Sequence, residues 1–386
     1  MKLKTLKALL DISNREMLFK EILNELELVK NLNFISYQIY KSSKIIIPVI
    51  KIAKNTKLDD CNHVKIFIGA QHNEYNGLFS MLKFFELLRE KKIELNDVAR
   101  SNQILIFIPL LNPYGFKNPS KSNKSGYYLE DGTNLNRFWC KAFIPNISNE
   151  NNDLKCKTLP GQVNIVKQIL QKYWDKHDVN LYILDFHETS LLERFQIELV
   201  NSLNPYYKFD HWLKEGIILN IMKLYDIPYY CKPLFFKCSP SADHAHLNLT
   251  HKQFEIVFEK LKEYNLRNHG IGKLPFYFCY NDKSKDYCLK LANTVYNNLK
   301  EKLWETYFPA FNHNFVNHGC FVNMSNLTSR PNIYSMELES QKHFFNIFEE
   351  IDKSNSDLDY FKKKLNLINV SIELALEAIK VMINTY

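Results

Sequence analysis

The sequence lacks the features that mark several classes of protein. No apolar run reaches the roughly 18 residues of a membrane-spanning helix, and the short apolar stretch near the amino terminus is broken by Asp11 and Asn14. We therefore expect no membrane span and no secretory signal. We expect the protein to be cytoplasmic. The net charge is +8, but no block of five or six like charges occurs, so we expect no nucleic-acid partner. Only ten of the 386 residues are glycine, which argues against widespread disorder.

The sequence also lacks closely spaced pairs of cysteines. The eight cysteines form no CxxC pair, so the sequence signals no zinc ribbon. Several lie in apolar runs, such as Phe278-Cys279-Tyr280, where cysteine acts as a small hydrophobic residue. In a chain of this length we expect reduced thiols rather than a disulfide framework.

The composition is that of a globular protein with a large core, because 46% of the residues are hydrophobic and 14% are aromatic. The chain shows no internal repeat and no low-complexity linker. We expect an N-terminal helical extension over residues 1–40, a catalytic domain over 41–340 and C-terminal helices over 341–386. Within the domain, residues 205–315 have weak patterns and are expected to form an insertion or lid.

One stretch, Val64–Gly77, has the pattern of a strand followed by a helix. Its apolar run from Val64 to Ala70 predicts a buried strand, which ends in the polar residues Gln71, His72, Asn73 and Glu74. A helical pattern begins after Gly77, as in the first half of a βαβ unit. Taken alone, the polar cluster is better explained as a loop that caps the helix than as a metal site.

Other apolar runs also lead into polar residues. They are Gln103–Leu110 before Asn112-Pro113-Tyr114-Gly115, Asn180–Phe186 before His187, and Asn332–Leu338, which contains Glu337. Ile45–Ala53 predicts a strand in which Pro48 indicates an edge or a bulge. If the strands are parallel neighbours, their polar ends emerge at one edge of the sheet, where open α/β sheets bind ligands. The sequence therefore predicts an α/β protein with a site at this edge.

The order of these motifs resembles that of the M14 zinc carboxypeptidase family and its deacylase relatives. The family pattern is His-x-x-Glu, Asn-Pro-x-Gly, Asp-x-Asn-Arg, Asp-x-His and Thr-x-Glu. The matching residues, over roughly residues 45–340, are Gln71-His72-Asn73-Glu74, Asn112-Pro113-Tyr114-Gly115, Asn134-Leu135-Asn136-Arg137, Asp185-Phe186-His187 and Ser335-Met336-Glu337. The resemblance implies a mixed, mostly parallel central sheet with helices on both faces, and helical extensions at both ends.

The resemblance also implies roles for individual residues. Gln71, Glu74 and His187 would hold Zn²⁺, and Glu337 would act as the general base. Asn136 and Arg137 match the family pair that holds a substrate's terminal carboxylate, a task that suits the planar guanidinium of arginine. Asp185 could orient His187 or have a purely structural role.

The sequence departs from the family pattern at three points. Gln71 stands where the family has its first histidine, and His72 is the alternate ligand. No arginine lies between residues 101 and 136, where the family usually has one to polarise the scissile carbonyl, so Lys121 or Lys124 would have to substitute. Glu339 shares a strand face with Glu337 and competes with it as the base.

The expected function is a zinc-dependent hydrolase that removes the C-terminal residue of a peptide, such as a peptidoglycan peptide. Two alternatives stay open at this point: a zinc-dependent amide deacylase acting on an N-acyl amino acid, and an inactive homologue that serves as a binding or scaffold protein. For either enzyme, the expected partner is a peptide or acyl-amino-acid substrate with a free carboxylate.

Overall fold

In the part of the chain that the structure describes, the strands form one eight-stranded sheet in the order β1-β2-β4-β3-β5-β8-β6-β7. The computed structural model describes residues 12–42, 45–54, 61–119, 126–144, 158–189, 276–303, 310–312, 319–341 and 358–385. The strands are β1 (Ile35–Ser42), β2 (Ile45–Ile52), β3 (His63–Ile68), β4 (Gln103–Ile108), β5 (Asn180–Thr189), β6 (Tyr277–Tyr280), β7 (Ala310–Asn312) and β8 (Ile333–Gln341).

The centre of the sheet is parallel. Strands β4, β3, β5 and β8 are consecutive parallel neighbours, whereas β2 and β6 flank them in the antiparallel sense. Four of the seven strand pairings are parallel, which confirms the predicted mixed, mostly parallel sheet. The carboxyl ends of the four central strands therefore share one edge of the sheet.

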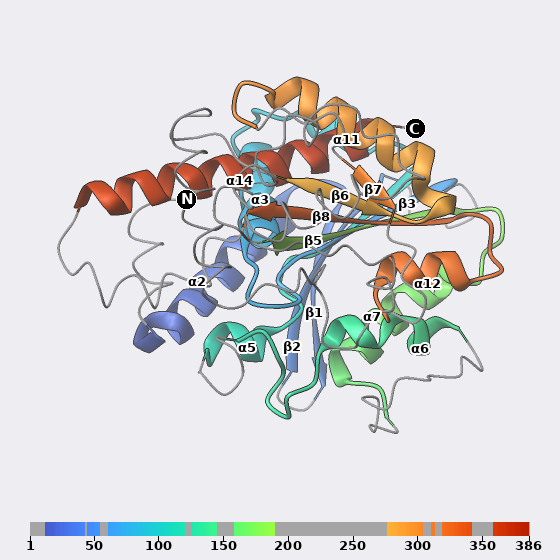
Figure 1. Cartoon of the computed structure of the whole chain (residues 1–386), viewed down its shortest axis with the longest axis horizontal. Helices are drawn as coiled ribbons and strands as arrows, with labels where there is room; N and C mark the ends of the chain where they lie inside the picture. Colours follow the sequence, from blue (N-terminus) through green and yellow to red (C-terminus); the bar gives the residue numbers. More distant parts are fainter. Residues whose placement is uncertain are drawn as a thin grey trace, which may run out of the picture.

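Helices cover both faces of the sheet. One large apolar cluster includes side chains of α2, α3, α11 and α14, and the other includes side chains of α6, α7 and α12. In Figure 1, α11 and α14 lie above the sheet, and α6, α7 and α12 lie below it. The α-helices are α2 (Arg15–Glu27), α3 (Asn76–Arg89), α4 (Leu95–Val98), α5 (Pro113–Lys117), α6 (Trp139–Phe143), α7 (Gly161–Trp174), α11 (Lys285–Leu299), α12 (Phe321–Leu327) and α14 (Leu358–Asn384). Short 3₁₀ helices are η1 (Ile12–Asn14), η2 (Leu28–Asn31), η4 (Leu135–Arg137) and η6 (Asp282–Ser284).

The central strands are apolar because they are covered on both sides. All six residues of β4 are buried, as expected for a parallel strand between two helical layers. Pro48 suggested that β2 is an edge strand or contains a bulge. Strand β2 is not at the edge, because it lies between β1 and β4. Its pairing with β4 spans only Ile50–Ile52, so Pro48, opposite Ile39 of β1, lies outside the stretch that pairs on both sides.

The N-terminal segment is less helical than the sequence suggested. Helix α2 and η2 are followed by β1, which begins at Ile35, inside the segment expected to be a helical extension through residue 40. Part of the expected insertion over 205–315 also belongs to the sheet, because β6 pairs with β8. Residues 190–275 lie outside the described part of the chain, and the domain division stays a prediction.

The C-terminal helix α14 packs against the main domain through apolar and polar contacts. The hydroxyl of Ser80 donates to the carbonyl of Ile372 at 2.8 Å. At the other end of α14, the buried Lys65 of β3 donates from Nζ to the carbonyls of Ile383 (2.9 Å) and Thr385 (3.1 Å) and to Gln103 Oε1 (3.0 Å). The carbonyls at the end of a helix have no partner within it, and Lys65 binds two carbonyls at the end of this one. Residues 342–357 of the expected C-terminal helices lie outside the described residues.

The structure bears on two expectations from the sequence, which concern membrane spans and the state of the cysteines. Among the described residues, no helix is long and apolar enough to cross a membrane. The described cysteines, which are Cys61, Cys140, Cys279, Cys288 and Cys320, are all buried free thiols.

Candidate metal centre

The chain reaches the candidate centre through a turn directly after β3. Ala70 has a φ of 47°, in the left-handed region that non-glycine residues seldom adopt. The carbonyls of Gly69 and Ala70 accept hydrogen bonds from the backbone N–H groups of Leu111 (3.1 Å) and Asn112 (2.9 Å), which follow the neighbouring β4. These bonds hold the turn in place, and the polar residues 71–74 are buried at the carboxyl edge of the sheet.

Three ligand-type side chains converge there. Nδ1 of His187, from the end of β5, lies 2.9 Å from Glu74 Oε2, and Nδ1 of His72 lies 3.3 Å from the same oxygen. All three side chains are buried, and their ligand atoms lie within 4.8 Å of one another. Ligand atoms about 2.0–2.1 Å from a tetrahedral zinc ion are themselves about 3.3 Å apart, so this spacing suits one ion.

Both imidazole rings are held from behind by a side-chain oxygen. Nε2 of His72 lies 3.0 Å from Asn134 Oδ1, and Nε2 of His187 lies 2.9 Å from Asp185 Oδ2. Both rings therefore present Nδ1 to Glu74 and Nε2 to an outer acceptor. Metal-binding histidines are usually fixed in this way, because the outer acceptor selects the tautomer and orients the free nitrogen.

The charges in the cluster are strongly linked. Burial alone would lower the pKa of His187, but the carboxylates of Asp185 and Glu74 outweigh it and hold that pKa well above its usual value. Burial alone would raise the pKa of Glu74, but His187 and His72 outweigh it and hold that pKa far below its usual range. Glu74 is therefore a carboxylate at neutral pH, which is the form that binds a metal ion.

Gln71 is next to the cluster but faces other partners. Its Oε1 accepts a hydrogen bond from Trp139 Nε1 at 2.7 Å, and its Nε2 donates to Asp185 Oδ2 at 3.5 Å. The amide oxygen, which is the atom that could bind a metal, is thus engaged by the indole. The structure brings His72 into the cluster with Glu74 and His187, and the role of Gln71 as a ligand stays a prediction.

Glu337 lies on the strand beside His187. In the register of β5 and β8, Glu337 is opposite Asp185 and Glu339 is opposite His187. Asp185, His187 and Glu337 form a second buried group of close ligand-type atoms, which does not include Glu339. Burial raises the pKa of Glu337 to about 7, and its Oε1 has no hydrogen-bond partner within the described residues. A carboxyl group with this pKa can accept and release a proton near neutral pH.

The two residues expected to bind a substrate carboxylate lie in a short 3₁₀ helix that precedes α6. Asn136 and Arg137 are in η4, whose first turn is capped by Asn134 Oδ1 accepting from the backbone N–H of Asn136 at 2.9 Å. The positive charge of Arg137 acts to lower the pKa of Glu337, but the larger effect of burial raises it. Oδ1 of Asn136 is buried and has no hydrogen-bond partner in the described part of the chain. Lys121 and Lys124, the expected substitutes for the missing arginine, lie outside the described residues.

Several residues support the centre without having been singled out from the sequence. Glu188 Oε1 accepts from the backbone N–H groups of Tyr75 (2.7 Å) and Asn76 (2.8 Å), so the carboxylate caps the start of α3 next to Glu74. Asn134 and Trp139 hold His72 and Gln71, respectively. Asn134 belongs to the Asn-x-Asn-Arg motif, which was identified from the sequence without a role for Asn134, whereas no sequence signal connects Trp139 to Gln71.

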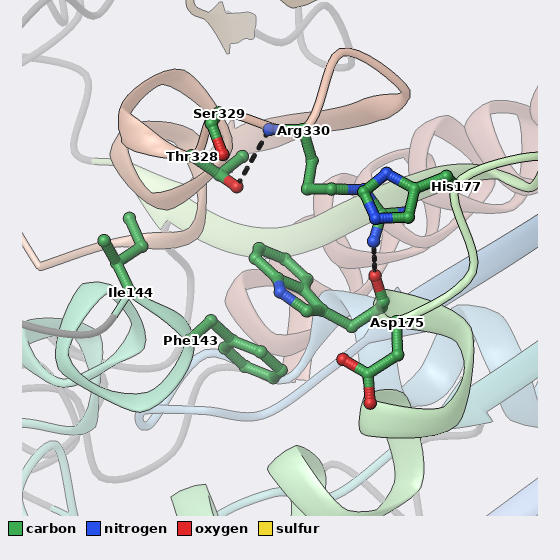
Figure 2. Close-up of a pocket in the computed structure, with 8 residues that line it drawn as sticks. Phe143, Ile144, Asp175, His177, Thr328, Ser329 and Arg330 are labelled. Carbon is green, nitrogen blue, oxygen red and sulfur yellow. Dashed lines mark hydrogen bonds between the residues drawn. The ribbon is translucent and has the colours of Figure 1, made fainter.

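A surface pocket of about 270 Å³ lies at the opposite edge of the sheet (Figure 2). It is formed where α6, α7 and α12 end and ahead of β8, and it is lined by Phe143, Ile144, Trp174, Asp175, His177, Thr328, Ser329 and Arg330. The guanidinium of Arg330 donates to the carbonyls of Trp174 and Lys176 and so caps the end of α7. Its Nη groups are therefore used by the fold itself.

Comparison of the chain with known proteins finds similar solved structures at low sequence identity. No family model matches the sequence, and no curated protein matches it. The similar structures include a metallo-carboxypeptidase from Burkholderia cenocepacia (TM-score 0.45, 11% identity, 94% of this chain and 69% of that chain). They also include a metallo-carboxypeptidase from Pseudomonas aeruginosa in complex with (2-guanidinoethylmercapto)succinic acid (TM-score 0.44, 12% identity, 95% and 69%) and thrombin activatable fibrinolysis inhibitor (TM-score 0.45, 11% identity, 94% and 74%).

The fold and the candidate centre characterise this protein independently of these comparisons. The chain is an α/β protein with a mixed sheet, and two histidines and a glutamate meet at the carboxyl edge of its parallel centre. The similarity to these solved structures, with every TM-score below 0.5, does not by itself indicate a function.

Proposed function

We propose that this protein is a zinc-dependent hydrolase of the metallocarboxypeptidase type, which removes the C-terminal residue of a peptide. The observation that carries the proposal is that His72 and His187 both direct Nδ1 at Oε2 of Glu74, while their Nε2 atoms are held by Asn134 and Asp185. Two imidazoles and one carboxylate form a donor set that is common in catalytic zinc sites, and it leaves a coordination position open.

The residues present fit a zinc ion by their chemistry. His72 Nδ1, Glu74 Oε2 and His187 Nδ1 would hold it, and Gln71 would brace the outer residues by linking Trp139 to Asp185. Zinc binds nitrogen and carboxylate oxygen well, and a buried set of these donors favours it over the oxygen-binding magnesium and calcium ions. When bound, the ion would polarise the scissile carbonyl group and acidify a water molecule.

Proton transfer is assigned to Glu337. Its carboxyl group is buried within the same group of side chains as His187, and its pKa is about 7, so it can accept a proton from the attacking water molecule. The same group can then give the proton to the leaving amine, as a general base that becomes a general acid. Glu339 is half-buried and lies outside this group, which favours Glu337 for the role.

Substrate binding is assigned to Arg137 and Asn136. Arg137 is half-buried, and its positive charge acts on the pKa of Glu337, which supports a role for both residues in one site. Oδ1 of Asn136, which has no hydrogen-bond partner among the described residues, could accept a hydrogen bond from the same substrate. A peptide with a free C-terminal carboxylate, such as a peptidoglycan peptide, has the chemistry that this pair would recognise.

The test compares two matched peptides, one with a free C-terminal carboxylate and one with a C-terminal amide, in the presence of zinc. We expect release of the last residue from the free-acid peptide, loss of activity after treatment with a chelator, and recovery when zinc is restored. Cleavage of an N-acyl amino acid but of neither peptide would support the deacylase instead. Zinc binding without cleavage of any of them would support a binding protein.

A further inference from the structure

Tyr127 covers one of the proposed zinc ligands. Its ring is stacked on the imidazole of His72, with ring centroids 3.9 Å apart and an angle of 10° between the planes. His72 is buried, whereas Tyr127 is half-buried, so the phenol ring lies on the outer side of the imidazole. We propose that Tyr127 is a positioning residue that fixes the ring plane of His72 for metal binding, an inference that rests on the proposed zinc site.

The Asn-Pro-Tyr-Gly turn after β4 holds Tyr127 in place. Asn112 Nδ2 donates to the carbonyls of Gly126 and Tyr128, both at 3.4 Å, which lie on either side of Tyr127. Asn112 Oδ1 accepts from the backbone N–H of Gly115 at 2.9 Å. One side chain therefore closes its own turn and binds the turn that carries Tyr127.

Two glycines allow these turns to touch. Gly115 and Gly126 pack so closely that a Cβ atom on either would clash with the carbonyl oxygen of the other, and Gly126 has a φ of +93°. Only glycine fits such an approach without strain. The backbone N–H of Asn112 is in turn bonded to Ala70, two residues before His72. The turn that carries Tyr127 and the segment that carries His72 are thus fixed to the same point at the end of β4.

The stacking has a direct consequence for the metal. His72 can direct Nδ1 at Glu74 and Nε2 at Asn134 only in one ring plane, and a stacked ring resists rotation out of it. Loss of a contact that orients a ligand commonly costs 10–100-fold in metal affinity. The aromatic ring of Tyr127, rather than its hydroxyl group, is therefore expected to strengthen zinc binding.

The experiment measures zinc affinity of the full chain by competition with a chromophoric chelator. Relative to the wild type, Tyr127→Leu should bind zinc about tenfold more weakly or worse, whereas Tyr127→Phe, which keeps the ring, should stay within about threefold. Tyr128→Leu is the matched control, since Tyr128 lies in the same turn and contacts Tyr127 edge-on at a centroid distance of 5.1 Å. It should also stay within about threefold.

A second readout needs no zinc. In the metal-free protein, the carbon-bound ring protons of His72 should be shifted upfield in the NMR spectrum by the stacked phenol ring. This shift should disappear in Tyr127→Leu and remain in Tyr128→Leu. Unchanged zinc affinity in Tyr127→Leu, or an equal loss in Tyr127→Phe, would overturn the inference. If the wild type itself binds no zinc, the proposed function fails, whereas the ring shift still reports whether Tyr127 orients His72.

Discussion

Nδ1 of His187 and Oε2 of Glu74 lie 2.9 Å apart, although 113 positions separate the two residues in the chain. The parallel pairing of β3 with β5 brings them together, because Ile68 at the end of β3 is level with Asp185 in β5. Glu74 then approaches from the turn after β3, and His187 lies two residues beyond Asp185. The contact is therefore a product of sheet register, and it supplies two of the three proposed zinc ligands.

The first prediction separates His72 from Gln71 as the third ligand. His72→Ala should lower zinc affinity at least about a hundredfold, because it removes a direct donor. Gln71→Met keeps a similar shape and leaves the three donors in place, so it should cost less than about tenfold, through looser support of Asp185. Zinc titration of both variants checks this. A larger loss in Gln71→Met than in His72→Ala would reverse the ligand assignment.

The second prediction concerns recognition of the substrate carboxylate. Arg137→Ala should lower kcat/KM for a free-acid peptide roughly 10–100-fold, the cost of losing a charge-assisted hydrogen bond. Any residual cleavage of the matched amidated peptide should change little. Arg137→Lys serves as the control and should fall between the wild type and Arg137→Ala, because it keeps the charge and loses the planar fork. An equal loss on both peptides would argue against a role in binding the carboxylate.

The third prediction separates the two glutamates of β8. Glu337→Gln keeps the shape of the side chain and removes its basicity, so turnover should fall at least about a hundredfold. Zinc affinity should stay near the wild-type value. Glu339→Gln is the matched control and should cost less than about fivefold in turnover, since Glu339 lies outside the buried group. If only Glu339→Gln inactivates the protein, the base has been assigned to the wrong residue.

The fourth prediction is a pH dependence of stability that arises far from the centre. Burial, together with the nearby charge of Arg100, lowers the pKa of Lys65 to about 7 in the folded protein, from 10.5. Between these values the unfolded state binds more protons than the folded state, so stability rises with pH across this window and is lost as pH falls towards 7. The wild type should therefore gain about 1 kcal/mol per pH unit relative to Lys65→Met from pH 7 to 9.

Urea unfolding of the wild type and Lys65→Met at several pH values measures this difference directly. Lys65→Met should be less stable overall at high pH, because it removes the hydrogen bonds that the neutral amine, with two N–H groups, donates among Gln103, Ile383 and Thr385. The two stability curves should converge as pH falls towards 7. Curves that stay parallel would show that Lys65 keeps an ordinary pKa in the folded state.

The parallel centre of the fold could be predicted from the sequence because burial on both faces leaves a plain signal. Strands β3, β4 and β5 each contain a mainly apolar stretch, and each of β3 and β4 is followed by a polar turn. Strand β1 was missed, since it lies at the edge of the sheet and more than half of its side chains are partly or fully exposed. Its mixed composition resembles the amphipathic helix that precedes it.

The site could be located from the sequence more easily than its ligands could be assigned. Motif order led to Glu74, His187 and Glu337, which the sheet register brings to one edge. The choice between Gln71 and His72 depends on the course of the chain after β3, where Ala70 adopts a left-handed conformation. An alanine gives no sequence signal for that conformation, in contrast to a glycine.

The most direct test of the account is anomalous diffraction at the zinc absorption edge from crystals grown with zinc. We predict one ion per chain, about 2.0–2.3 Å from His72 Nδ1, Glu74 Oε2 and His187 Nδ1, with Gln71 still bonded to Trp139. An ion bound by Gln71 Oε1 instead of His72, or the absence of an anomalous peak between Glu74 and His187, would contradict the account.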